Sequence, residues 1–352
     1  MGIDEAKLGE LMGRLVGDLG AVAAAPLVVI GDRLGLYKTM AAAGPMTPEA
    51  LAARAGVNER YLREWLNSQA AGGYVTYDAG AGTYCLTEEQ AAALAVEDSP
   101  AFVQGGFQCA VAMYAALDRL ERSFRTGDGI PWGEQHPCLF EGTFRFFRPA
   151  YMASLLSEWI PSLDGVQQKL ERGGTVADVG CGQGFSTVLM AKAFPASRFV
   201  GFDSHAGSIE AARRWAEREG VGERVSFEVA RSTDFPGGRF DLVAHFDCLH
   251  DMEDPAGAAR HARKRLASDG TWMIIEPMAG DHPEENHNPI GRVFYSASTQ
   301  ICVPHSLSQG GPALGVQARE ARLRRVVVDE GGFSSMRVAH RAPFNLILEA
   351  RP

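Results

Sequence analysis

The segment VADVGCGQGFST, Val176–Thr187, decides the fold of this chain. An apolar strand runs into a G-x-G-x-G turn, and a helical pattern follows the turn. Glycines at such a turn let the backbone approach a ligand closely, and the next helix offers its N-terminal amides. A second strand, Arg198–Phe202, leads to Asp203, and a carboxylate at the tip of a neighbouring strand suits a ribose diol. The pattern indicates a site for a nucleoside cofactor.

Two cofactors compete for a turn of this kind. A dinucleotide fingerprint reads G-x-G-x-x-G/A, and its third glycine relieves packing beside a pyrophosphate. Here the third glycine, Gly184, comes one residue early, and Phe185 fills the dinucleotide position. The Asp178 carboxylate would repel a phosphate but would suit a cationic amino group. Both departures favour S-adenosylmethionine, whose amino-acid tail carries an ammonium, over a nicotinamide dinucleotide.

Further cofactor contacts are expected where the second and fourth strands end, because ligands of open α/β sheets bind at the carboxyl ends of strands. We predict that the cofactor is bound by Asp178, Gly180, Gly182, Gly184, Phe185, Asp203, Ser204, Phe246 and Asp247. The resemblance described below adds Ser232 and Asp234 to these cofactor contacts.

The composition is that of an ordinary globular protein. The chain has 352 residues, which favours two domains, and its net charge of −9 argues against nucleic acid or an anionic membrane as the main partner. Six scattered cysteines without C-x-x-C pairs predict reduced thiols rather than a disulfide frame or a zinc site. The polar, acidic start lacks the features of a secretory signal, and the apolar run Ala21–Ile30 is too short to span a bilayer. We therefore expect a cytoplasmic protein without a membrane partner.

Residues 1–99 predict an N-terminal helical domain of the winged-helix type. Thr47 and Asn58 are helix caps, and a hairpin follows Gly72-Gly73. The second helix balances Arg60 and Arg63 with Glu59 and Glu64, which disfavours DNA binding. Leu8, Leu11, Leu15 and Leu19 fall on one face of an earlier helix. Since these helices lack partners for their apolar faces, we expect the domain to mediate a homodimer and to line part of the substrate chamber.

Residues 100–165 predict a helical linker and a substrate lid that is rich in aromatic side chains. The segment 132–151 adds histidine and arginine to its aromatics, a mixture that suits a lid over a small organic molecule. We expect substrate contacts from Trp132, His136, Phe144, Arg148, Tyr151 and Tyr295.

Residues 166–352 alternate strands and helices, as in a doubly wound, mostly parallel sheet. The predicted strands are Thr175–Val179, Arg198–Phe202, Val225–Val229, Phe240–His245 and Thr271–Glu276, and the predicted helices are Gly184–Phe194, Ser208–Glu219 and Pro255–Ala267. After Leu323–Val328, the segments Ser335–His340 and Asn345–Glu349 meet directly and predict a terminal antiparallel hairpin. The fold class is therefore α/β, a Rossmann-like sheet behind the helical domain.

Chemistry-bearing residues follow the fourth and fifth strands. His250 titrates near neutrality and can accept a proton from a hydroxyl, and Asp251 or a carboxylate from elsewhere could orient it. Glu276 ends the fifth strand and should face the same cleft. An isolated histidine in this position could equally be an idle residue before the next helix.

These motifs together resemble the class I S-adenosylmethionine-dependent methyltransferases, on Val176–Thr187, Asp203, Leu249-His250-Asp251 and Ile275-Glu276-Pro277. With the winged helix, the chain is similar to small-molecule O-methyltransferases of plants and of bacterial secondary metabolism. The resemblance implies that His250 is the general base and that a residue after the third strand binds adenine. We expect Asp247 and Glu276 to lie near His250 in supporting roles. Met252 replaces the family's tryptophan, so the pocket beside the base differs. At the adenine position, Asp234 and Ser232 are rivals.

Several alternatives remain open at this point. The same fold can transfer the methyl group to nitrogen, carbon or sulfur, or serve a cofactor-sensing regulator whose winged helix binds DNA. Metal assistance is a rival mechanism, but the acidic and histidine residues show no firm ligand spacing. We therefore predict no catalytic metal.

Overall fold

The computed structural model describes residues 2–352 and divides them into two units by their internal contacts. The first unit comprises residues 2–112 and Pro137–Pro149, and the second comprises Met113–His136 and Ala150–Pro352. The aromatic segment 100–165 is thus shared between the two units. The three domain boundaries read from the sequence stay a prediction.

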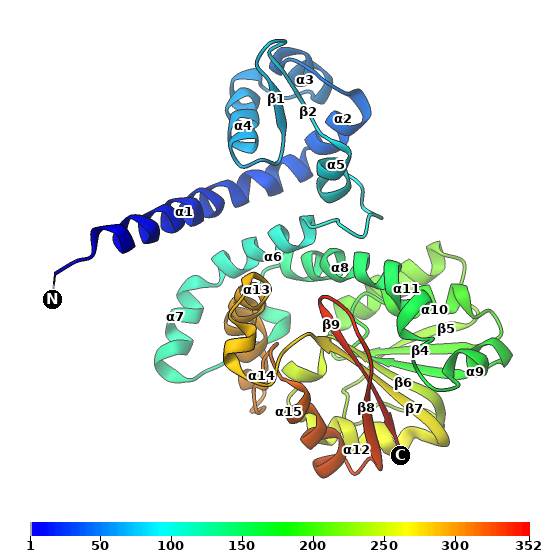
Figure 1. The fold of residues 1–352 in the computed structure, drawn as a ribbon. Helices are drawn as coiled ribbons and strands as arrows, with labels where there is room; N and C mark the ends of the chain where they lie inside the picture. Colours follow the sequence, from blue (N-terminus) through cyan, green and yellow to red (C-terminus); the bar gives the residue numbers. More distant parts are fainter. Residues whose placement is uncertain (1) are drawn as a thin grey trace. The chain divides into compact units, whose positions relative to one another are not determined.

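The first unit holds the winged-helix domain that the sequence predicts (Figure 1). Its elements are α1 (Glu5–Arg33), α2 (Leu36–Ala43), α3 (Pro48–Ala55), α4 (Glu59–Ala71), β1 (Thr76–Asp78), β2 (Thr83–Cys85), α5 (Glu88–Leu94), most of α6 (Gln104–Ala115) and most of α8 (Cys138–Ala150). The side chains of Thr47 and Asn58 accept hydrogen bonds from the first turns of α3 and α4, which confirms both predicted caps. Strands β1 and β2 pair in an antiparallel hairpin.

Helix α1 is longer than the sequence analysis allows. It runs through Pro26, so the apolar run Ala21–Ile30 is only a part of it. Within residues 2–352, α1 is the one helix long and apolar enough to cross a membrane by length and composition. The length of the whole helix therefore does not argue against a membrane span, although core helices of soluble proteins pass the same test. The predicted apolar face is confirmed as helical, and its leucines are exposed.

The second unit is built around a seven-stranded sheet with the order β5-β4-β3-β6-β7-β9-β8. Its strands are β3 (Thr175–Val179), β4 (Arg198–Asp203), β5 (Val225–Val229), β6 (Phe240–Phe246), β7 (Leu266–Pro277), β8 (Ser335–Arg341) and β9 (Asn345–Arg351). The first five are parallel, and β9 pairs antiparallel with both β7 and β8. The predicted sheet and its terminal hairpin are confirmed.

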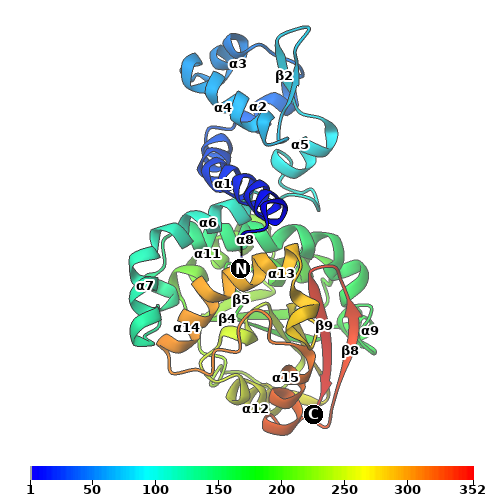
Figure 2. The ribbon, with the colours of Figure 1, turned by 60° about the vertical axis from the view of Figure 1, so that its left-hand side comes forward.

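Four helices flank this sheet (Figures 1 and 2): α9 (Val166–Arg172), α10 (Phe185–Ala193), α11 (Ala206–Arg218) and α12 (Pro255–Arg265). The second unit also contains α7 (Leu117–Thr126), α13 (Pro289–Ala297), α14 (Val303–Ser308) and α15 (Glu320–Arg324), with the 3-10 turns η1 (Trp132–Glu134), η3 (Leu249–Asp251) and η4 (Pro283–Asn286) and the π-helical segments η2 (Tyr151–Trp159), η5 (Ser298–Cys302) and η6 (Arg325–Glu330). Helices α10 and α11 contact β4 and β5, whereas α12 contacts β6 and β7. The segment Leu323–Val328 is helical, in α15 and η6.

The order of the strands predicts where a ligand would bind. The chain leaves β3 toward β4 on one side and returns to β6 on the other, so the direction of winding reverses between β3 and β6. Strands β3 and β6 are buried along almost their whole length, as expected for a parallel sheet covered on both faces. In open α/β sheets, ligands bind outside the carboxyl ends of strands at such a reversal. The functional side chains are therefore to be sought after β3, β4, β6 and β7.

Candidate active site

The glycine turn after β3 depends on backbone that other residues rarely adopt. Gly180, Gly182 and Gly184 have φ values of 75°, 54° and 81°. A Cβ on Gly180 would lie 2.6 Å from the Cys248 sulfur, and one on Gly184 would lie 2.6 Å from the Phe227 ring. A Cβ on Gly182 would meet nothing within 4 Å. Two of the glycines thus permit close packing, and the third leaves open space where a ligand can approach.

Asp178 is a buried carboxylate, and only one of its two oxygens has hydrogen-bond partners in residues 2–352. Its Oδ2 accepts hydrogen bonds from Ser186 Oγ at 2.7 Å and from Thr187 Oγ1 at 2.6 Å. Its Oδ1 is buried without a hydrogen-bond partner in residues 2–352. Burial raises the pKa of Asp178 to about 6, helped by the charge of Asp203 and opposed by the two hydroxyls. An ammonium group is the ligand that would satisfy the remaining oxygen.

Asp203, at the end of β4, holds the glycine turn in place. Its Oδ2 accepts from the Gly182 amide at 2.9 Å, and its Oδ1 accepts from the His205 amide at 2.8 Å. Burial raises the pKa of Asp203, and the two amides oppose that rise. Ser204, the next residue, is exposed. The carboxylate is positioned at the tip of β4, as the sequence predicts, while its contact with a ribose stays a prediction.

The loop after β5 carries Asp234 and Ser232, the two residues that could bind adenine. The Asp234 side chain is exposed and turned back on its own loop, where it accepts from the Arg231 amide at 3.2 Å. Ser232 is half-buried. Phe185 packs near the Trp215 ring of α11, with ring centroids 6.4 Å apart. These three contacts with the cofactor stay predictions.

Asp247 follows β6 in a left-handed conformation, with a φ of 51°. Its Oδ2 accepts from the Tyr151 hydroxyl at 2.8 Å, and its Oδ1 accepts from the Asn345 amide at 2.8 Å. Burial, together with the charge of Glu276, raises its pKa to about 7. Both oxygens are therefore occupied by neighbours from η2 and β9. Phe246 lies beside Tyr151, with ring centroids 5.4 Å apart.

His250 and Glu276 form a buried pair at the ends of β6 and β7. The ring Nδ1 of His250 lies 2.5 Å from Glu276 Oε2, and the His250 amide donates to Oε1 at 3.3 Å. His250 is 3% exposed and Glu276 is 1% exposed. Burial alone would lower the pKa of His250, but the Glu276 carboxylate and a contact with Cys302 outweigh it and raise the pKa well above its ordinary value. Glu276, rather than Asp251, is the carboxylate that orients the ring.

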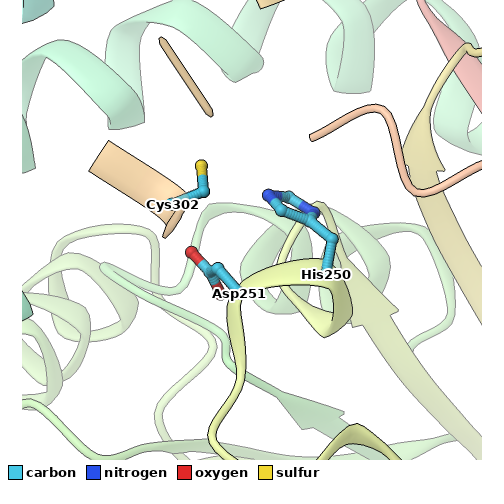
Figure 3. A group of neighbouring side chains, drawn as sticks. All are labelled: His250, Asp251 and Cys302. Atoms are coloured by element: carbon cyan, nitrogen blue, oxygen red, sulfur yellow. The ribbon is translucent and has the colours of Figure 1, made fainter. Parts of the chain in front are cut away.

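Cys302 is the residue that sequence reasoning missed. It comes from η5, is buried, and is hydrogen-bonded to His250. Figure 3 shows its sulfur and the Asp251 carboxylate on the side of the ring that faces away from the backbone of His250. No local motif marks this cysteine, because it reaches His250 only through the packing of η5 against the rest of the unit.

The six predicted substrate residues are divided between the two units. The Trp132 amide donates to His305 Nδ1 at 3.2 Å, and Tyr151 contacts Asp247. Tyr295 on α13 is 39% exposed, and His136 is also exposed. Phe144 and Arg148 belong to the first unit, where Arg148 pairs with Asp98. Substrate contact by these residues stays a prediction.

Comparison with known proteins agrees with this geometry. Residues 22–96 match the family model of the Rv2258c-like winged HTH domain, and residues 170–308 match that of a methyltransferase domain. The chain is 28% identical over 142 residues to a mitochondrial ubiquinone biosynthesis O-methyltransferase of Candida albicans, covering 38% of this chain and 43% of the relative. It is 29% identical over 132 residues to the sterol 24-C-methyltransferase erg6 of Aspergillus fumigatus, covering 36% of this chain and 35% of the relative. The chain thus spans less than half the length of these curated relatives.

The likeness in fold to a solved structure extends over the whole chain. The crystal structure of human N-acetylserotonin methyltransferase in complex with S-adenosylmethionine superposes with a TM-score of 0.72 at 17% identity, covering 100% of this chain and 99% of the human one. At this identity the likeness is one of fold, and the family models assign a methyltransferase domain to residues 170–308 and a winged HTH domain to residues 22–96. This chain therefore joins a methyltransferase domain to a winged HTH domain of the Rv2258c-like type.

Proposed function

We propose that this protein transfers a methyl group from S-adenosylmethionine to a hydroxyl oxygen of a small molecule, with His250 as the general base. The observation that carries the proposal is the His250–Glu276 pair, which lies at the ends of β6 and β7. Strand β6 is the direct neighbour of β3, which leads into the glycine turn. A proton acceptor and a cofactor turn on adjacent strands are the two parts that O-methylation requires.

The residues of the turn fit S-adenosylmethionine, which supplies an activated methyl group when bound. Asp178 Oδ1 is the buried, unmatched oxygen that would hold the ammonium of the amino-acid tail. Asp203 would accept from the ribose hydroxyls, and the space over Gly182 leaves room for the cofactor. Both carboxylates disfavour a phosphate group, which supports this cofactor over a dinucleotide.

Glu276 orients the His250 ring for its role as the proposed base. In its neutral form, with the Nδ1 proton donated to Glu276, the ring has a lone pair on Nε2 that can accept the proton of an acceptor hydroxyl. The raised pKa of His250 makes this form a stronger base and also lowers the share of the ring that is neutral near pH 7. The imidazolium that forms is stabilised by the Glu276 carboxylate, 2.5 Å away. This is the arrangement in which a third group orients the base and compensates its charge.

The direct test is a transfer assay with acceptors of different chemistry. Purified protein is incubated with S-adenosylmethionine and a panel of phenols, alcohols, amines and thiols of similar shape, and the methylated products are identified by mass spectrometry. We expect transfer to hydroxyls that requires His250. The relatives include both an O- and a C-methyltransferase by name, so methylation of nitrogen, carbon or sulfur alone would overturn the choice of oxygen.

The second candidate function is that of a regulator that binds DNA, and the paired charges on α4 disfavour it. Arg60 pairs with Glu64, and Arg63 pairs with both Glu49 and Glu59. A helix whose cations are already paired offers little to a phosphate backbone. We expect no shift of genomic DNA fragments in a gel at moderate salt, and a specific shift would overturn this part of the proposal.

We also propose a cytoplasmic homodimer that buries the exposed face of α1. This face carries Leu8, Leu11, Met12, Leu15, Val16, Leu19 and Val22, each at least 37% exposed. Light scattering should give a dimer at micromolar concentration, Leu15→Glu with Leu19→Glu should give a monomer, and Lys7→Glu should change nothing. Recovery of the protein in a membrane fraction would instead assign α1 to a bilayer.

A further inference from the structure

Three side chains with metal-binding atoms, His250, Asp251 and Cys302, meet on the side of the His250 ring that Glu276 does not occupy. His250 and Asp251 come from the turn η3, and Cys302 comes from η5. One nitrogen, one carboxylate oxygen and one sulfur from these residues lie within 4.8 Å of one another (Figure 3). His250 and Cys302 are buried, and Asp251 is half-buried. An imidazole, a carboxylate and a thiol that lie this close together can bind one metal ion.

The orientation of the histidine matches that of a metal ligand. Its Nδ1 is already paired with Glu276 Oε2 at 2.5 Å, so Nε2 is the nitrogen that faces Asp251 and Cys302. Metal-binding histidines almost always donate their other ring N–H to a carboxylate or carbonyl, which fixes the ring and raises the basicity of the ligand. Glu276 also accepts from the His250 amide, so one carboxylate holds both the ring and the backbone.

The donor set is selective. One imidazole, one thiolate and one carboxylate suit zinc, whereas magnesium and calcium prefer oxygen alone. In a tetrahedral zinc site the donors lie roughly 3.5 Å apart. The 4.8 Å separation would therefore have to shrink by on the order of 1 Å, which rotation of the side chains can supply. Three protein ligands leave a fourth position open.

We propose that His250 Nε2, the Asp251 carboxylate and the Cys302 thiolate bind one zinc ion, and that this ion switches the base off. Binding releases the thiol proton of Cys302 to solvent, because the thiolate is the ligand. It also occupies the Nε2 lone pair that accepts the proton of the acceptor. The inhibitory part rests on the proposed role of His250 as the base, whereas the metal site itself does not.

The binding test uses the full-length protein, freed of metal with a chelator. Zinc is titrated in competition with a chromophoric chelator, and cobalt(II) is titrated while the absorption spectrum is recorded. We expect one ion per chain and a thiolate-to-cobalt charge-transfer band in the near ultraviolet. Cys302→Ser should weaken zinc binding at least tenfold and abolish the band, while Cys85→Ser, in the β1–β2 hairpin, should leave both unchanged. A cobalt spectrum of the parent protein without the band overturns the site, whatever the variants do.

The turnover test separates the two parts of the proposal. Zinc should inhibit methyl transfer with half-inhibition at the dissociation constant found by titration, and a chelator should restore the rate. If zinc binds through Cys302 and the rate stays the same or rises, inhibition is overturned together with the role of His250 as the base, and the metal site stands. If no acceptor is methylated, the binding test still decides the site.

Discussion

The candidate active site has a cofactor side, after β3 and β4, and a proposed base side, after β6 and β7, and these two sides are built in opposite ways. On the cofactor side, Asp178 is bonded to Ser186 and Thr187, which follow it within one turn and helix start. On the base side, His250 meets Glu276 and Cys302, which come from distant parts of the sequence. The first side is local and the second is assembled by the fold.

The two sides also differ in how their charges are balanced. Asp178 keeps one buried oxygen without a partner in residues 2–352, so its charge is left for a ligand to satisfy. Glu276 has its partner inside the protein, in the ring and amide of His250. We conclude that the cofactor side is completed by binding, whereas the base side is complete before binding. Substitutions on the two sides should therefore separate affinity from turnover.

The largest effect is expected on the base side. His250→Ala should lower turnover on a hydroxyl acceptor about a hundredfold or more, because it removes the proton acceptor. The dissociation constant of S-adenosylmethionine should stay unchanged, since Asp178 and Asp203 are untouched. Initial rates and calorimetry measure the two quantities, with His340→Ala on β8 as the control. Turnover within about threefold of the parent, with the chemical step rate-limiting, would make His250 a structural residue.

Asp203→Ala should do the opposite. The change removes the acceptor for the Gly182 and His205 amides and the predicted partner of the ribose. Hydrogen bonds to a charged group are worth about 1.5–3 kcal/mol, so the affinity for the cofactor should fall roughly ten- to a hundredfold. Turnover at saturating cofactor should change by only a few fold. Glu228→Ala, on the exposed side of β5, is the control. A fall in turnover at unchanged affinity would contradict the division between the two sides.

The sequence predicts the strand and the glycine turn of the cofactor side because their determinants are neighbours in the chain. The strand, the three glycines and Asp178 lie in one segment, and the spacing of its residues is itself the signal. The base side was predicted only as far as its strand ends allowed: His250 and Glu276 follow β6 and β7, so they had to share an edge. Cys302 could not be predicted, because a buried cysteine carries no local pattern. The length of α1 was missed because the apolar run Ala21–Ile30 was considered by itself, whereas the helix extends from Glu5 to Arg33.

Asp178→Asn should lower the affinity for the cofactor about tenfold and stabilise the free protein. The raised pKa of about 6 means that the folded state disfavours the charged carboxylate relative to the unfolded chain. This cost is absent below the unfolded pKa of 3.8, grows as the pH rises toward 6, and is complete above it. Asparagine removes the charge, so stability at pH 8 should rise by on the order of 1–3 kcal/mol. Denaturant unfolding at pH 8 and pH 4 measures the gain, which should be lost at the lower pH. Equal gains at both pH values would show that it does not come from the charge.

The smallest effect is a proton released when the cofactor binds. With a pKa of about 6, Asp178 is largely protonated at pH 5.5 in the free protein, and an ammonium beside it favours the carboxylate. Binding at pH 5.5 should therefore release roughly three-quarters of a proton from Asp178, and almost none at pH 8. Affinity should fall as the pH drops through 6. Calorimetry with S-adenosylhomocysteine in buffers of different ionisation enthalpy measures the release. Asp203 and Asp247 also titrate above their ordinary range, so the decisive quantity is the difference between the parent and Asp178→Asn. Equal proton release by the two proteins would show that the cofactor's ammonium is not held by Asp178, and the comparison of the two sides would lose its electrostatic basis.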